Sequence, residues 1–141
     1  APAAFIGTGT GLTPFRAMLQ AALTSQGPLA APLVVLAGHR DESRVLWRNE
    51  FETWAATHPH LTYSLTLSHP SHAWQGRTGY VQDHLLDLMD TSNPQEFYLC
   101  GHTPMVQQVR EMLVERHGIS AKKIYTELTS AEAALLRNRV R

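Results

Sequence analysis

Glycines alternate with threonines in the segment Phe5-Ile6-Gly7-Thr8-Gly9-Thr10-Gly11-Leu12-Thr13-Pro14-Phe15-Arg16. An apolar run precedes them and a helical pattern follows, which predicts a strand, a tight turn and a helix. Glycine allows positive φ and lets a ligand approach the backbone without a Cβ in the way. The free N–H groups at a helix start bind anions such as a pyrophosphate. The segment is therefore a candidate phosphate-binding turn.

The spacing of these glycines differs from the dinucleotide fingerprint G-x-G-x-x-G. Counted from Gly9, the third glycine would stand where Pro14 stands. A purely structural turn therefore remains the alternative for this segment taken alone. We expect Thr13 to cap the helix and Pro14 to occupy its first position, where a missing N–H costs nothing.

A second segment, Phe97-Tyr98-Leu99-Cys100-Gly101-His102-Thr103-Pro104-Met105-Val106, again predicts a strand, a small-residue turn and a capped helix. Together the two segments resemble the nicotinamide-nucleotide domain of the ferredoxin–NADP reductase superfamily. That family has G-T-G-x-[AT]-P after its first strand, C-G-x-x-x-M before its last helix and an acidic residue after its last strand. Glu127 matches the acidic residue, and the resemblance extends from about Ala3 to Glu127.

The resemblance implies an NAD(P)H-binding module of a flavin-dependent oxidoreductase. In the family a flavin-binding domain with an R-x-Y-[ST] motif precedes this one, and the chain contains no such motif. We therefore expect FAD to be held by an upstream domain of the full-length protein, and this chain to be inactive alone. The implied electron acceptor is an iron–sulfur or haem partner, such as a ferredoxin or a [2Fe-2S] domain. The alternative is a non-catalytic nucleotide-binding regulatory domain.

Two residues have implied catalytic roles. The resemblance places Cys100 beside the nicotinamide, where it acts by position rather than as a nucleophile. It places Glu127 near the nicotinamide and the flavin, where a carboxylate can hydrogen-bond or manage protons. From the residues alone, a buried core cysteine and a solvated carboxylate remain open.

The segment Ser68-His69 replaces the Ser-Arg of NADPH-preferring relatives. An arginine binds a 2′-phosphate by paired charged hydrogen bonds, whereas histidine is mostly uncharged at neutral pH. The sequence therefore favours NADH over NADPH, with Arg40 and Arg77 as alternative phosphate ligands. The predicted cofactor-binding residues are Gly7, Thr8, Gly9, Thr10, Gly11, Thr13, Pro14, His39, Arg40, Ser68, His69, Arg77, Gly101, His102 and Met105.

Strand and helix patterns alternate along the chain, which predicts an α/β fold: a three-layer, doubly wound, Rossmann-like domain with a five-stranded parallel sheet. The predicted strands are Ala3–Ile6, Leu33–Ala37, Leu61–Leu67, Glu96–Leu99 and Lys123–Glu127. The predicted helices are Pro14–Thr24, Arg44–Thr57, Tyr80–Met89 and Pro104–Arg116. We expect one domain over residues 1–129 and a helical tail over 130–141.

Composition excludes several classes of partner. Lys+Arg and Asp+Glu both number 12, so the net charge does not suggest nucleic acid binding. No apolar run suits a membrane span, and the N-terminal residues do not resemble a signal peptide. The single cysteine fits a reducing, cytoplasmic location. Eight histidines occur without a CxxC or HExxH pattern, so we expect no metal site.

Overall fold

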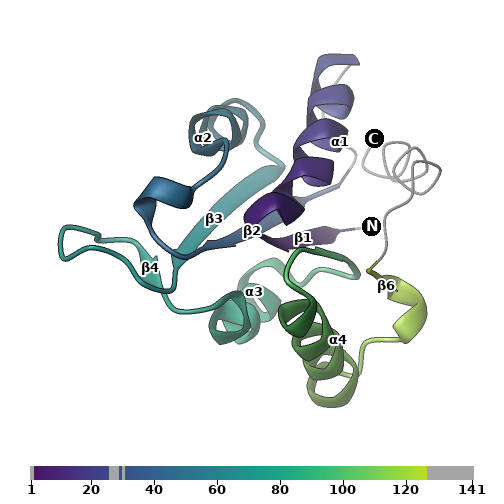
Figure 1. The fold of residues 1–141 in the computed structure, drawn as a ribbon. Helices are drawn as coiled ribbons and strands as arrows, with labels where there is room; N and C mark the ends of the chain where they lie inside the picture. Colours follow the sequence, from purple (N-terminus) through teal and green to yellow (C-terminus); the bar gives the residue numbers. More distant parts are fainter. Residues whose placement is uncertain (1, 26–28, 30, 127–141) are drawn as a thin grey trace.

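The computed structural model describes residues 2–25, 29 and 31–126 (Figure 1). Its described part contains a six-stranded sheet in the order β4-β3-β2-β1-β5-β6, and every pair of neighbours is parallel. The strands are β1 (Ala3–Thr8), β2 (Leu33–His39), β3 (Leu61–Leu67), β4 (Arg77–Thr78), β5 (Glu96–Cys100) and β6 (Ile124–Tyr125).

Helices cover both faces of this sheet, with α1 and α2 on one side and α3 and α4 on the other (Figure 1). The α-helices are α1 (Leu12–Ser25), α2 (Arg48–Thr57), α3 (Leu85–Ser92) and α4 (Thr103–His117). Short 3₁₀ turns are η1 (Gly9–Gly11), η2 (Glu42–Arg44), η3 (Val81–His84) and η4 (Ala121–Lys123). The fold is the predicted three-layer α/β architecture. No helix of the described part is long and apolar enough to cross a bilayer.

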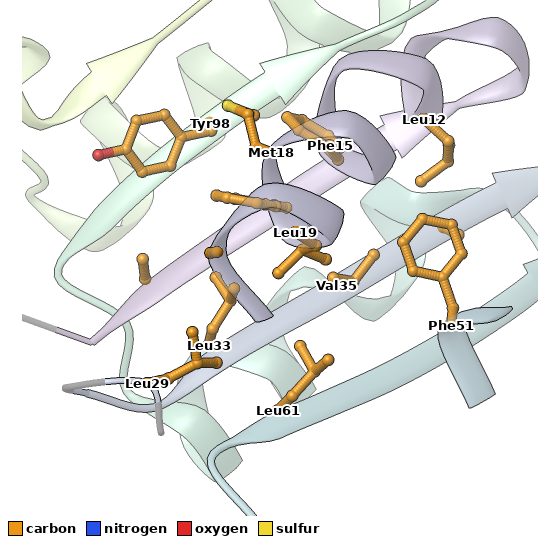
Figure 2. Packing of buried hydrophobic residues seen from close by; sticks show 14 residues of the cluster. Leu12, Phe15, Met18, Leu19, Leu29, Leu33, Val35, Phe51, Leu61 and Tyr98 are labelled. Atoms are coloured by element: carbon orange, nitrogen blue, oxygen red, sulfur yellow. The ribbon is translucent and has the colours of Figure 1, made fainter. Parts of the chain in front are cut away.

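Alternate residues of each central strand face opposite layers, so both layers have an apolar core. Phe5 of β1 packs in the layer under α1, and its ring stacks on Phe15 with centroids 4.6 Å apart. The next residue, Ile6, packs in the other layer with Leu113 of α4. Figure 2 shows the first cluster, in which α1 lies over the central strands. This two-sided burial explains the continuous apolar run of β2.

Strand order reverses between β1 and β5. From β1 the chain proceeds outward through β2 and β3 to β4, and from β5 it proceeds the opposite way to β6. In open parallel sheets this reversal leaves a crevice at the carboxyl ends of the two strands, where ligands bind. The fold therefore places the turns after Thr8 and Cys100 side by side.

The prediction of five strands is wrong by one. The additional strand β4 pairs in parallel with residues 66–67 of β3. Two residues are too few to show an alternating pattern, so this strand could not be predicted from the sequence.

Two helix starts also differ from the predictions. Helix α1 begins at Leu12, because the 3₁₀ turn η1 already starts the helical path, so Thr13 is not its N-cap. The second helix does not begin at Arg44: the turn η2 and a left-handed Trp47 (φ 55°) precede α2. Asp41 caps η2 rather than α2, because its carboxylate accepts a hydrogen bond from Ser43 N (3.1 Å).

The third predicted helix divides in the same way, into the 3₁₀ turn η3 and the helix α3. Pro14 is the third residue of α1 rather than its first. The predicted role of Glu127 and the predicted tail over 130–141 lie outside the described residues.

Candidate functional site

A groove of about 1160 Å³ lies at the carboxyl edge of the sheet, where the strand order reverses. Residues from the ends of β1, β2, β3 and β5, from η3 and from the start of α4 line it. Twelve predicted site residues are among them: Thr8, Gly9, Thr10, Gly11, His39, Arg40, Ser68, His69, Cys100, Gly101, His102 and Met105. The fold thus brings together segments that are up to about a hundred residues apart.

Four predicted site residues are not part of the groove lining. Gly7 is buried within β1, and Thr13 and Pro14 lie in the first turn of α1. Arg77 lies on β4, where its guanidinium forms an ion pair with Asp87 at 2.7 Å.

Main-chain contacts hold the two turns at the reversal point together. A Cβ on Gly11 would lie 2.3 Å from the carbonyl oxygen of Cys100. Gly101 has φ +133°, and a Cβ there would lie 2.4 Å from Thr8 Oγ1. That same oxygen accepts a hydrogen bond from His102 N at 3.0 Å. These glycines are therefore required for close packing of the turns.

Gly9 differs from both, although it belongs to the same turn. Its φ is +53°, and no described atom lies within 4 Å of the position that its Cβ would take. The space beside it is open and belongs to the groove. Thr103 and Pro104, at the start of α4, line the same groove. Two helix N-termini and an accessible backbone suit an anionic ligand such as a pyrophosphate.

The groove also contains buried polar atoms without partners. His39, only 7% exposed, has no hydrogen-bond partner for either ring nitrogen in the described part of the chain. Burial lowers the pKa of His39. Gln82 Nε2 donates to Gln108 Oε1 (2.8 Å), while Gln82 Oε1 is buried and unpaired among the described residues. Unpaired buried polar groups of this kind require an explanation, and a ligand would satisfy them.

Main-chain hydrogen bonds fix the ends of β2 and β3 to each other. Ser68 N donates to His39 O at 3.0 Å, and His69 N donates to Arg40 O at 2.7 Å. Ser68 Oγ and His69 Nδ1 lie 3.0 Å apart at the exposed rim. The two side chains replacing the family's Ser-Arg are thus held next to Arg40.

Two arginines line this side of the groove, Arg40 and Arg44. Arg44 pairs loosely with Asp41, at 3.7 Å, and its side chain is 64% exposed. Arg40 is exposed as well, so both arginine side chains can approach an anionic ligand in the groove. Arg77, in contrast, is held by its ion pair with Asp87.

Cys100 ends β5 at the groove and is half-buried. Burial raises the pKa of its thiol, while the neighbouring Gly101 N–H lowers it to a lesser extent. The thiol is therefore neutral at physiological pH and is a poor nucleophile. This environment agrees with a role by position. No group of three or more metal-ligating side chains occurs in residues 2–25, 29 and 31–126.

Several lining residues were not anticipated from the sequence. They are Gly38, Arg44, Gly79, Tyr80, Val81, Gln82, Thr103, Pro104 and Gln108. Tyr80 is the most informative of them, because its aromatic side chain is 58% exposed at the groove. Its position directly after a loop glycine was the available signal, since binding residues often lie on loops held by a rigid scaffold.

Comparison with known proteins identifies the family of this chain. Residues 5–111 match the family model described as the oxidoreductase NAD-binding domain. The chain is 37% identical over 133 residues to ferredoxin–NADP reductase B of Sorangium cellulosum, covering 90% of this chain and 54% of the relative. It is 29% identical over 126 residues to the anthranilate 1,2-dioxygenase electron transfer component of Acinetobacter baylyi, covering 89% and 36%.

A solved structure supports the fold. The cytochrome b5 reductase domain of Ulva prolifera nitrate reductase superposes with a TM-score of 0.76 at 24% identity, covering 89% of this chain and 48% of that one. The chain thus spans about half, or less, of the length of these relatives.

Proposed function

Because this chain belongs to the oxidoreductase NAD-binding domain family of the ferredoxin–NADP reductase superfamily, we propose that it is the NAD(P)H-binding module of a flavin-dependent oxidoreductase. The observation that carries the proposal is the paired turn at the strand reversal. There Gly11 and Gly101 permit close packing, while Gly9 leaves its backbone open to a ligand. This arrangement suits a pyrophosphate placed across the end of β1.

The two sides of the groove then bind the two halves of the dinucleotide. We assign the nicotinamide to the β5 side, next to Cys100 and Gly101, and the adenosine to the side of Arg40, Ser68 and Tyr80. The bound cofactor supplies hydride chemistry, and this chain binds and orients it. Cys100 contributes a neutral, half-buried thiol that lines the nicotinamide side of the groove. Glu127, outside the described residues, is proposed to approach the nicotinamide and flavin.

The partners are part of the proposal. The chain spans 54% of the Sorangium reductase, and an FAD-binding domain upstream is the proposed hydride acceptor. A relative is named as the electron transfer component of a dioxygenase. We extend this to the present protein as onward transfer to an iron–sulfur or haem acceptor, such as a ferredoxin.

We further propose that NADH is preferred over NADPH. The support is His69 in place of an arginine, together with the ion pair that holds Arg77 away from the groove lining. Arg40 and Arg44 are the residues that could reverse this preference, because both line the groove. The Sorangium relative is named for NADP, so a direct comparison of the two cofactors is required.

A fusion protein tests the main proposal. We expect the isolated chain to be colourless, and a chain fused behind a family flavin-binding domain to reduce ferricyanide with NADH. The same fusion carrying Gly9→Val is the matched control and should lose this activity while retaining its flavin spectrum. Nucleotide binding without reduction in any well-folded fusion would favour the regulatory alternative. Stoichiometric flavin on the isolated chain would contradict the assignment of FAD to another domain.

A further inference from the structure

Among the polar side chains that line the groove, His39 has the least complete hydrogen bonding. It is 7% exposed, and neither ring nitrogen has a hydrogen-bond partner in the described part of the chain. A neutral imidazole has one donor and one acceptor, so both go unused in the free protein. A buried group in this state needs a compensating interaction, and His39 lines the groove where one could be supplied.

The position of His39 places it next to the open part of the glycine turn. It ends β2 one residue beyond Gly38, which pairs with Thr8, the residue immediately before Gly9. By strand alternation its side chain faces the same layer as Val35 and Ala37, the layer that α1 covers. The turn η1 also contacts β2. His39 is therefore the ionisable side chain of β2 that lies closest in register to Gly9.

The glycine turn itself offers an anion no side-chain positive charge. Residues 7–14 contain neither lysine nor arginine, and the next basic residue, Arg16, is bound to Glu50 by two of its nitrogens. Phosphate oxygens accept hydrogen bonds and do not donate them. An imidazole that gains a proton presents two donors, which a phosphate can use, whereas a neutral ring leaves its acceptor unpaired.

We propose that His39 takes up a proton when a pyrophosphate binds at the glycine turn, so that nucleotide binding is coupled to protonation of this residue. The inference rests on the proposed nucleotide-binding function. In the free protein, burial lowers the pKa of the ring and so favours its neutral form. The bound anion replaces the missing partners and favours the imidazolium. Because both nitrogens are buried before binding, the ring must reorient as the ligand enters.

Other charged and titratable groups face the same groove and must be separated from His39. Arg40 and Arg44 follow β2, His69 follows β3, Tyr80 precedes η3, Cys100 ends β5, and His102 precedes α4. Asp41, which pairs with Arg44, is not part of the groove lining. The arginines keep their charge, and burial keeps the Cys100 thiol neutral. His69 and His102 are exposed, so each is tested with its own variant.

Calorimetry in buffers of different ionisation enthalpy measures the protons taken up on binding. The probe is ADP-ribose, since its pyrophosphate does not titrate between about pH 5.5 and 8, where histidine does. We expect uptake of up to one proton near the acid end, and an affinity that rises up to tenfold per pH unit as the pH falls. His39→Asn and His39→Gln should abolish the uptake, whereas His69→Asn, His102→Asn and the exposed control His72→Asn should retain it.

The outcomes distinguish the two proposals. ADP-ribose binding without proton uptake, or uptake that persists in a folded His39 variant, overturns the inference and leaves the nucleotide-binding function intact. Uptake lost only with His69→Asn or His102→Asn assigns it to that residue and also overturns the inference. No binding of ADP-ribose at any pH contradicts the proposed function itself. If neither His39 variant folds, the other variants decide. Proton uptake that persists in both His69→Asn and His102→Asn supports His39 as the residue protonated. Absence of proton uptake in the wild-type protein overturns this role of His39.

Discussion

The two sides of the groove are built in different ways. On the β1–β5 side, main chains pack against each other, and Gly11 and Gly101 leave no room for a side chain. On the β2–β3 side, side chains such as Arg40 and His69 line the ligand space at an exposed rim. The first side depends on where glycines occur, and the second depends on which polar residues occur. Substitutions on the first side should therefore affect folding, and those on the second side should affect ligand choice.

Gly9 and Gly11 bring this difference into a single turn. A Cβ on Gly11 would meet the backbone of Cys100, whereas a Cβ on Gly9 would meet no described atom within 4 Å. The two glycines are two residues apart and both line the groove, yet Gly11 packs against the turn after β5 whereas Gly9 has open space beside it. Parallel substitutions at the two positions separate packing from binding.

The largest expected effect is that of Gly11→Ala on stability. The new methyl would lie 2.3 Å from the Cys100 carbonyl oxygen and 2.6 Å from Gly101 Cα, so backbone must move. We expect the free energy of unfolding to fall by roughly 3 kcal/mol, at the upper end of overpacking costs. Urea denaturation measures this. Gly118→Ala is the control for backbone strain without a steric contact, because its φ is +66° and its Cβ would meet no described atom within 4 Å, so it should cost only about 1–2 kcal/mol. Equal losses in the two variants would contradict close packing at Gly11.

Gly9→Val should weaken nucleotide binding with a smaller cost to folding. The φ of +53° penalises a side chain by about 1–2 kcal/mol, and the branched Cβ occupies the space that a pyrophosphate needs. We expect NAD⁺ affinity to fall roughly hundredfold, or about 2.7 kcal/mol, by calorimetry. Unchanged NAD⁺ affinity in a folded Gly9→Val protein would show that the pyrophosphate does not bind at this turn.

These glycines also show what the sequence could and could not predict. The strand–turn–helix pattern around Gly9 and Cys100 predicts the fold and the adjacency of the two turns, because parallel strands end at one edge. It does not separate the roles of Gly9 and Gly11, which depend on the distance to a segment about ninety residues away.

The β2–β3 side was predicted less completely. Loop residues such as Arg44 and Tyr80 have no periodic pattern, and the two-residue strand β4 that positions the loop is too short for one. Arg77 shows why sequence patterns do not predict which side chains line the groove, because its ion-pair partner Asp87 lies ten positions away on α3. Its exclusion from the groove lining depends on tertiary contacts. Whether the lining residues bind a nucleotide remains a prediction.

His69→Arg should shift the choice of cofactor rather than overall affinity. A guanidinium beside Ser68 can form charged hydrogen bonds to a 2′-phosphate, so we expect preference to move towards NADPH by roughly 1–3 kcal/mol. Titration of wild type and variant with 2′-phospho-AMP and with AMP measures the change. Arg40→Gln and Arg44→Gln are the matched controls, because both side chains line the groove. The NADH assignment would be wrong if the wild-type protein already preferred the 2′-phosphate and if Arg40→Gln or Arg44→Gln removed that preference.

The smallest expected effect is a dependence of stability on pH. His39 has a pKa below its usual value of 6.5 in the folded protein. As the pH falls below about 6.5, the unfolded chain binds a proton that the folded chain does not, so stability decreases until the folded pKa is passed. Denaturation from about pH 8 to 5.5 should show this loss, and His39→Gln should reduce it. Asp41 and Glu42, whose pKa values are lowered, contribute only at more acidic pH. An identical pH profile in the variant would contradict the buried, neutral state of His39.

The most direct test of the two-sided groove is amide NMR of the isotope-labelled chain with two ligands. NAD⁺ should shift the amides of Gly9, Ser68, Cys100 and Gly101, whereas ADP-ribose should shift Gly9 and Ser68 and leave Cys100 nearly unchanged. Gly118, at the far end of α4, is the internal reference. Shifts in this pattern would place the nicotinamide at β5 and the adenosine at β2–β3. Shifts outside the groove, or equal shifts at Cys100 with both ligands, would contradict this binding mode.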